Sequence, residues 1–103
     1  MSPDVYQAVA DPTRRAILNQ LRVSARQVND IARAFPISRP AVSKHLRVLR
    51  NARLVTESRE GRNRVYRLNP GPLREIDQWL DSYRRFWSGN LDSLKQYVES
   101  QPR

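Results

Sequence analysis

The segment from Phe35 to Leu54 constrains the fold of this chain more than any other part of the sequence. Pro36 disfavours helical geometry at Phe35, so a preceding helix must end there. Ser38 can cap a new helix, and Pro40 is tolerated in its first turn because the N–H groups of that turn have no intrahelical partner. The segment therefore predicts a helix that ends at Phe35, a tight turn, and a second helix that begins at Ser38.

The second helix has two chemically different faces. Val42, Leu46 and Leu49 are spaced by four and then three residues, which predicts one buried stripe. Hydroxyls and cations occupy the opposite face and suit base edges and phosphate oxygens: Ser38, Arg39, Ser43, Lys44, Arg47 and Arg50. The alternative interpretation is an amphipathic helix whose basic face is simply solvated.

Positive charge is concentrated in the middle of the chain. The 103 residues carry a net charge of +9. Residues 33–69 hold ten basic and two acidic side chains, whereas residues 1–32 hold four and three, and residues 70–103 hold five of each. A charge that served only solubility would be spread more evenly, so this distribution predicts a surface that binds a polyanion.

Three helices are predicted before the second helix of this motif. A short one at about residues 3–10 has Val5, Tyr6 and Val9 on one side and must pack against another element to be stable. Asp11 and the proline after it begin another helix, which continues to about residue 23. Residues 28–35 then show the i, i+3, i+4, i+7 apolar pattern of the helix that precedes the tight turn.

A β-hairpin is predicted after the second helix. Residues 54–59 and 64–68 have the composition of strands, and residues 60–63 can form the turn between them. Four polar side chains converge at its tip: Arg59, Arg62, Asn63 and Arg64. Such a hairpin directly after a recognition helix is typical of a winged helix. The alternative is that these arginines only protect the sheet edge by charge.

A long helix at about residues 72–99 is predicted to complete the fold. It carries both tryptophans and two tyrosines, an aromatic enrichment typical of an interface. The aromatics could instead close the core of a monomer, and we expect both roles, the distal half facing a partner. The residues predicted for a homodimer interface are Val5, Tyr6, Val9, Tyr83, Phe86, Trp87, Leu91, Leu94, Tyr97 and Val98. The same aromatics could line a pocket for an unidentified small-molecule effector.

The predicted fold is mainly α with a small β-hairpin: a winged helix-turn-helix of about five helices and a two-stranded wing, in one domain over residues 1–103. The absence of cysteine excludes disulfides and thiolate metal sites and fits a reducing cytoplasm. We identify no signal peptide. No apolar stretch approaches the length of roughly 20 residues that is needed to span a bilayer, so no membrane partner is expected. With one histidine and no cysteine, we expect neither an enzyme nor a cofactor.

Several segments, in this order, resemble the ArsR/SmtB family of winged-helix transcriptional repressors: residues 10–18, 38–49, 54–55 and 60–68. The resemblance covers about residues 6–73. The last helix, with Trp79 and Phe86-Trp87, resembles the metal-independent, SdpR-like branch. This resemblance implies a homodimer joined through its first and last helices, which represses transcription by binding double-stranded DNA at an inverted-repeat operator.

Two features depart from the family pattern. The founding members sense metals through cysteines on the first helix of the helix-turn-helix, and others use His and carboxylates on the last helix. Here Asp77 and Asp81 lie on the last helix without a histidine, so no metal site is expected. Arg53 stands where the family usually has glycine, and a left-handed backbone there would cost about 1–2 kcal/mol.

The residues predicted to bind DNA lie on the second helix and the hairpin: Ser38, Arg39, Ala41, Ser43, Lys44, His45, Arg47, Arg59, Arg62, Asn63 and Arg64. For His45, a phosphate contact and a helix-packing hydrogen bond remain alternatives. A winged-helix protein-interaction module is a competing function, but it would not need this charge. A non-specific or RNA-binding protein is a further competing function. Recognition of single-stranded RNA would favour several exposed aromatic residues within the basic surface, but Tyr66 is the only aromatic residue of the hairpin.

Overall fold

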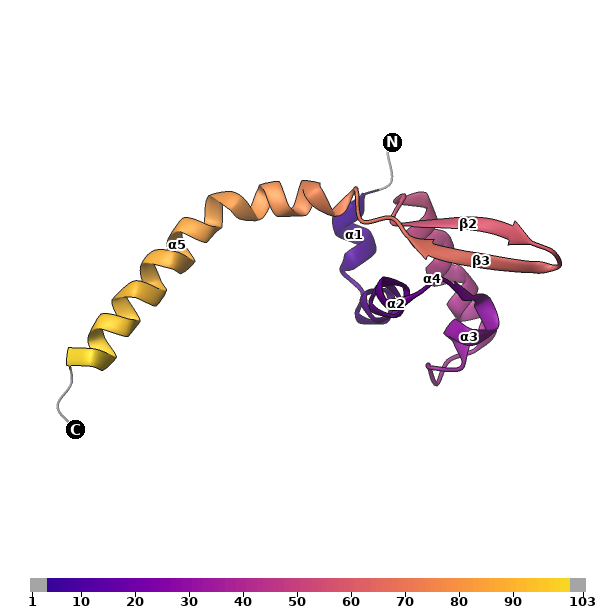
Figure 1. Ribbon diagram of the computed structural model, residues 1–103, viewed down its shortest axis with the longest axis horizontal. Coiled ribbons are helices and arrows are strands. Elements are labelled where there is room, and N and C mark those ends of the chain that lie inside the picture. The colour runs from indigo at the N-terminus through magenta and orange to yellow at the C-terminus, as the bar shows by residue number, and fades with distance from the viewer. Residues whose placement is uncertain (1–3, 101–103) are drawn as a thin grey trace.

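The computed structural model describes residues 4–100, apart from the side chains of residues 90–97 and 100. This part of the chain forms five helices and three strands (Figure 1): α1 (Val5–Val9), α2 (Pro12–Val23), β1 (Arg26–Gln27), α3 (Val28–Ala32), α4 (Arg39–Asn51), β2 (Val55–Glu60), β3 (Asn63–Leu68) and α5 (Leu73–Ser100). The predicted winged helix-turn-helix is confirmed, with α3 and α4 as the two helices of the motif.

Helix starts follow the capping residues of the sequence. The Asp11 carboxylate accepts a hydrogen bond from the Arg14 backbone N–H at 2.9 Å and caps α2. The Ser38 hydroxyl accepts one from the Ala41 N–H at 3.2 Å and caps α4. Both satisfy first-turn donors that have no carbonyl partner within the helix. The predicted starts of these two helices are therefore confirmed.

The first helix of the motif is shorter than predicted. α3 ends at Ala32, so the prediction that it continues to Phe35 is wrong. The chain tightens into turns instead, with the Ala34 N–H bonded to the Ile31 carbonyl at 3.2 Å and the Phe35 N–H to the Ala32 carbonyl at 3.1 Å. Phe35 still packs against the core, which explains why its apolar spacing resembled a helical position.

α4 ends in a Schellman motif centred on Arg53. The Leu54 N–H bonds to the Leu49 carbonyl at 3.0 Å, and the Arg53 N–H bonds to the Arg50 carbonyl at 2.9 Å. Arg53 takes a φ of 62° to make this turn, in the left-handed region. The position where the family usually has glycine therefore has a left-handed backbone in this chain.

The sheet contains one strand more than predicted. Its order is β1-β3-β2, all antiparallel, with β3 in the centre. The two residues of β1 are too few to show an alternating pattern, and the strand exists because it pairs with a distant segment. We call β2, β3 and the turn between them (residues 55–68) the wing. Gly61, with a φ of 64°, lies in its turn.

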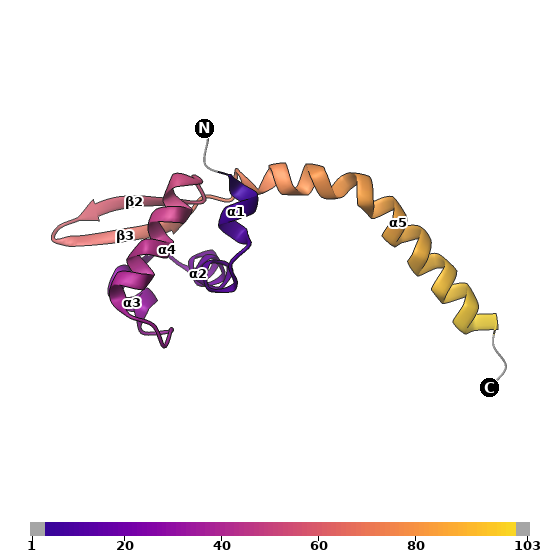
Figure 2. The same cartoon turned by 180° about the vertical axis from the view of Figure 1, so that it is seen from behind.

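The core lies between α2, α3, α4 and the base of the wing. Ile17, Ile31, Leu49 and Leu54 are fully buried there. α5 begins beside α1 and then extends away from this body, as Figures 1 and 2 show from opposite sides. The molecule is consequently elongated, about 65 × 35 × 20 Å. Within the described part of the chain, no helix has the length and apolar character needed to cross a membrane.

Candidate nucleic-acid interface

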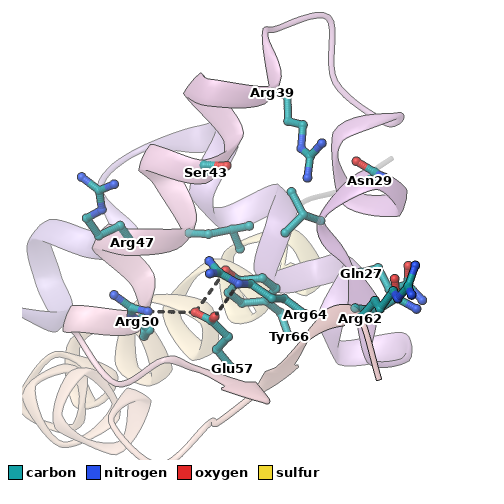
Figure 3. A pocket seen from close by; sticks show the side chains of 13 residues that line it. Gln27, Asn29, Arg39, Ser43, Arg47, Arg50, Glu57, Arg62, Arg64 and Tyr66 are labelled. Carbon is teal, nitrogen blue, oxygen red and sulfur yellow. Dashed lines mark hydrogen bonds and ion pairs between the residues drawn. The ribbon is translucent and has the colours of Figure 1, made fainter. Parts of the chain in front are cut away.

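A hollow of about 340 Å³ lies between α4, the wing and the start of α3 (Figure 3). Five arginines line it, three from α4 and two from the wing: Arg39, Arg47, Arg50, Arg62 and Arg64. The remaining polar side chains around it are Gln27, Asn29, Ser43, Glu57, Asn63 and Tyr66. The surface is therefore strongly cationic and rich in hydrogen-bond donors.

Helical spacing places the α4 residues on one side of the hollow. Arg39, Ser43 and Arg47 follow one another at intervals of four, which keeps them on the same face of a helix. All three side chains are exposed. Leu46, on the neighbouring stripe, is 1% exposed and holds this helix against the core. The buried stripe therefore fixes the direction in which the polar face points.

The register of the wing supplies the opposite side. Glu57 pairs with Tyr66 across β2 and β3, and Arg59 pairs with Arg64. Residues two apart on a strand share a face, so Arg64 and Tyr66 lie on the same side of β3 as Glu57 does on β2. This side faces α4, and Figure 3 shows these three side chains converging near Arg50.

Glu57 connects the recognition helix to the wing. Its Oε2 accepts a hydrogen bond from Arg50 Nη1 at 2.8 Å and another from the Tyr66 hydroxyl at 3.2 Å. Its Oε1 lies 3.5 Å from Arg64 Nε, while the Glu57 side chain is only 19% exposed. Burial and the neighbouring Glu57 charge raise the pKa of Tyr66, so its hydroxyl remains a donor at neutral pH.

Six of the eleven residues predicted to bind DNA line this hollow: Arg39, Ser43, Arg47, Arg62, Asn63 and Arg64. The other five lie outside it. Lys44 and Arg59 are exposed on the same two elements, Ser38 caps α4, and Ala41 is half-buried. The fifth, His45, faces a different part of the molecule.

His45 lies against the N-terminal helices. Its Nδ1 is 3.4 Å from Arg14 Nη1 and 3.9 Å from Asp11 Oδ2. Arg14 also donates to the Ala8 carbonyl at 2.8 Å and to the Gln7 carbonyl at 3.0 Å, which caps the C-terminal end of α1. Of the two alternatives for His45, this geometry favours the packing interaction. The capping role of Arg14 was not anticipated.

Sequence reasoning missed several residues of the hollow: Gln27, Asn29, Arg50, Glu57 and Tyr66. Arg50 lies on the polar face of α4 by its spacing but is not among the residues predicted to bind DNA. In the sequence, Glu57 is one of only two acidic residues between residues 33 and 69, and nothing near it in the sequence indicates a role in the hollow. Its position follows from the pairing of Glu57 with Tyr66, so a register assigned to the hairpin would have identified it.

The residues predicted for a dimer interface fall into three groups. On α5, Tyr83 is 44% exposed, Phe86 67%, Trp87 50% and Val98 64%. On α1, Tyr6 and Val9 are half-buried, whereas Val5 is 3% exposed and belongs to the core of the single chain. The Tyr6 hydroxyl donates to the Glu75 carbonyl at 3.2 Å, and its ring packs edge-on against Trp79. Leu91, Leu94 and Tyr97 lie outside the described side chains.

Comparisons with known proteins agree with this architecture. Residues 11–57 match the family described as "Bacterial regulatory protein, arsR family". HTH-type transcriptional regulator Rv2034 of Mycobacterium tuberculosis is 46% identical over 97% of this chain and 92% of its own length. Transcriptional repressor SdpR of Bacillus subtilis is 38% identical over 75% of this chain and 86% of its own length.

A solved structure has the same fold. The crystal structure of an ArsR family transcriptional regulator superposes with a TM-score of 0.72 at 30% identity, over 81% of this chain and 86% of that chain. The named relatives are transcriptional regulators, which are not enzymes. From these identities and the shared winged helix-turn-helix, the chain belongs to the ArsR family of bacterial regulatory proteins.

Proposed function

We propose that this protein is a sequence-specific, double-stranded DNA-binding transcriptional regulator, which represses transcription as a homodimer on an inverted-repeat operator. The observation that carries the proposal is the hollow of five arginines between the recognition helix and the wing. Arginine binds phosphate and guanine in a bidentate manner, and five of them on one surface form an electrostatic footprint for DNA. DNA binding would place its action in the bacterial cytoplasm.

The recognition helix α4 would enter the major groove, which is wide enough to admit an α-helix. Arg39, Ser43 and Arg47 would then face base edges. Arg62, Asn63 and Arg64 on the wing would contact the flanking phosphates or the minor groove. Lys44 and Arg59, exposed beside the hollow, would add phosphate contacts. His45, which lies against Arg14 and Asp11, would position α4 and not touch DNA.

The homodimer would form through α5 together with α1. Several large aromatic side chains of α5 are exposed to solvent in the single chain. Exposed apolar surface of this kind is typical of a protein–protein interface. A two-fold dimer presents two recognition helices, which matches two half-sites about one turn of DNA apart, roughly 34–36 Å. Repression would follow from occlusion of the promoter.

The test is binding to a duplex from the DNA upstream of the protein's own coding region, compared with a scrambled duplex. We expect the native duplex to bind at least about 10³-fold more tightly. If roughly 6–10 phosphates are neutralised, affinity should fall by about 10³–10⁵ between 50 and 200 mM salt. Arg47→Ala should weaken binding to the native duplex by about 10- to 100-fold, as expected for the loss of one bidentate contact.

The matched control is Arg85→Ala. Arg85 is exposed on α5, does not line the hollow, and its substitution removes the same charge. It should leave DNA binding close to that of the unmodified protein. Equal and weak binding of both duplexes would contradict the proposal, and an equal effect of the two substitutions would contradict the assignment of the hollow. The first of these results would favour a protein-interaction role for the winged helix instead.

A further inference from the structure

We propose that Glu57 is a specificity-determining residue of the DNA interface, because it restrains Arg50 and Arg64 from pairing indiscriminately with the phosphates of unrelated DNA. The inference rests on the proposed function and concerns a residue that does not need to touch DNA. Among the described residues that line the hollow, Glu57 is the single acid beside five arginines.

A carboxylate at this position opposes affinity for a polyanion. It repels phosphates directly, and it occupies two cations that would otherwise bind them. Arg50 lies 2.8 Å from one Glu57 oxygen, and Arg64 lies 3.5 Å from the other. Purely electrostatic binding to DNA would be stronger without the Glu57 side chain. Glu57 therefore contributes something other than affinity for phosphates.

Glu57 is built into the interface and is not a loose surface charge. Its side chain is 19% exposed, compared with 56% for Glu60 on the same strand. The Tyr66 hydroxyl donates to it at 3.2 Å, which fixes the carboxylate relative to the wing. Each of its oxygens therefore has a defined partner, and the wing is held against α4 through Arg50 (Figure 3).

Two consequences follow for the arginines. In a complex with unrelated DNA, Arg50 and Arg64 stay paired to Glu57, so they release fewer counterions and add little affinity. In a complex with the operator, both are already oriented, so less side-chain entropy is lost when they meet their contacts. Glu57 thus lowers non-specific binding more than specific binding, which raises the ratio between the two.

The experiment compares Glu57→Gln with Glu60→Gln. Both substitutions remove one negative charge from β2, and both residues pair with an arginine, but Glu60 pairs with Arg67 and does not line the hollow. On the scrambled duplex, Glu57→Gln should bind about 5- to 10-fold more tightly, and the slope of log affinity against log salt should steepen by about one to two. The ratio of native to scrambled affinity should fall about tenfold.

Glu60→Gln should show at most a small, general charge effect. The inference is overturned if the two variants behave alike, or if Glu57→Gln weakens both duplexes equally without changing the salt slope, because that pattern indicates only a structural role. The slope on the scrambled duplex is informative even if the native duplex is not preferred. Failure of the proposed operator and failure of the Glu57 inference are therefore distinguishable.

A second pair of variants tests the same point with Glu57 intact. Arg50 is restrained by Glu57, whereas Arg47 takes part in no ion pair within the described part of the chain. Arg47→Gln should therefore flatten the salt slope on the scrambled duplex by about 0.9, and Arg50→Gln should leave it nearly unchanged. An equal loss in the two variants would mean that Arg50 is free to bind phosphate, which would overturn the inference.

Discussion

Arg53 occupies a backbone position that favours glycine. The Schellman motif after α4 requires a left-handed residue, and Arg53 adopts a φ of 62° there. For an L-residue with a Cβ, this geometry costs about 1–2 kcal/mol. The turn is retained because Leu49 and Leu54, which its hydrogen bond joins, are both fully buried. Burial of these two leucines therefore stabilises the turn enough to offset the backbone strain at Arg53.

Replacing Arg53 by glycine should stabilise the protein. Glycine removes the left-handed strain but gains more freedom in the unfolded chain, which offsets about 0.4–1 kcal/mol of the benefit. We expect a net gain in the free energy of unfolding of about 0.5–1 kcal/mol, or roughly 3–6 °C in Tm, measured by thermal unfolding. Arg53→Ala is the control, since it removes the same charge but keeps the Cβ. An equal gain from alanine would assign the effect to charge and not to the backbone.

At the residue scale, the sequence predicted what depends on near neighbours. The caps Asp11 and Ser38 bond to N–H groups three residues away, so they can be recognised locally. The contacts of Glu57 join residues seven to nine positions apart through the register of a hairpin and its packing on α4. His45 and Arg14 are 31 residues apart. Such contacts depend on how the whole chain folds, and the local spacing of residue types in the sequence does not determine them.

At the element scale, Asp11 couples the start of α2 to the recognition helix. Its carboxylate accepts the Arg14 N–H in the first turn of α2 and lies 3.9 Å from His45 on α4. The bond from the Arg14 N–H, helped by the charges of His45 and Arg14, lowers the pKa of Asp11 below its ordinary value of 3.8. The ionised form is therefore favoured in the folded state.

The lowered pKa of Asp11 makes a prediction for stability in acid. A carboxylate whose folded pKa is lowered stabilises the protein above its unfolded pKa, and this contribution is lost as the pH falls through the folded pKa. Asp11→Asn keeps a good cap without a titrating group. The difference in free energy of unfolding between the unmodified protein and this variant should therefore shrink as the pH falls below about 4. Denaturant unfolding at each pH measures it, and parallel profiles would contradict the role.

Element boundaries were predictable where a single residue sets them. Asp11 starts α2 and Ser38 starts α4, as expected, but α3 ends at Ala32 because tight turns compete with the last helical turn. Strand β1 was missed because its two residues gain their structure only by pairing with Val65 and Tyr66. Composition and periodicity thus indicated the long elements well, and tertiary pairing determined the short ones.

At the scale of the whole molecule, α5 leaves an apolar surface that a single chain does not cover. Its N-terminal end is anchored, since Ile76 packs on the core and the Tyr6 ring packs against Trp79. Farther along, α5 extends away from the body (Figure 1). On this part of the helix, Phe86 and Trp87 are 67% and 50% exposed. A second copy of this chain is the partner that the proposed function requires, because an inverted repeat is read by a two-fold dimer.

Trp87→Arg should therefore dissociate the protein while leaving each chain folded. Trp87 lies beyond the buried core, so far-UV circular dichroism should change little. Burying an arginine in place of an aromatic anchor should cost at least about 2 kcal/mol of association, a roughly 30-fold weaker dimer. Sedimentation velocity over a range of concentrations measures this shift. Binding to the native duplex should weaken in parallel, since one chain contacts only one half-site.

Gln78→Arg provides the matched control for the dimer. Gln78 is exposed on α5, nine residues before Trp87, which places it on the opposite side of the helix, and its substitution adds the same charge. It should leave both the association constant and DNA binding almost unchanged. If Trp87→Arg remained as dimeric as Gln78→Arg, the exposed aromatics of α5 would need another partner. If it became monomeric yet bound the native duplex as tightly as before, the regulator would act as a monomer, and the inverted-repeat operator would have to be abandoned.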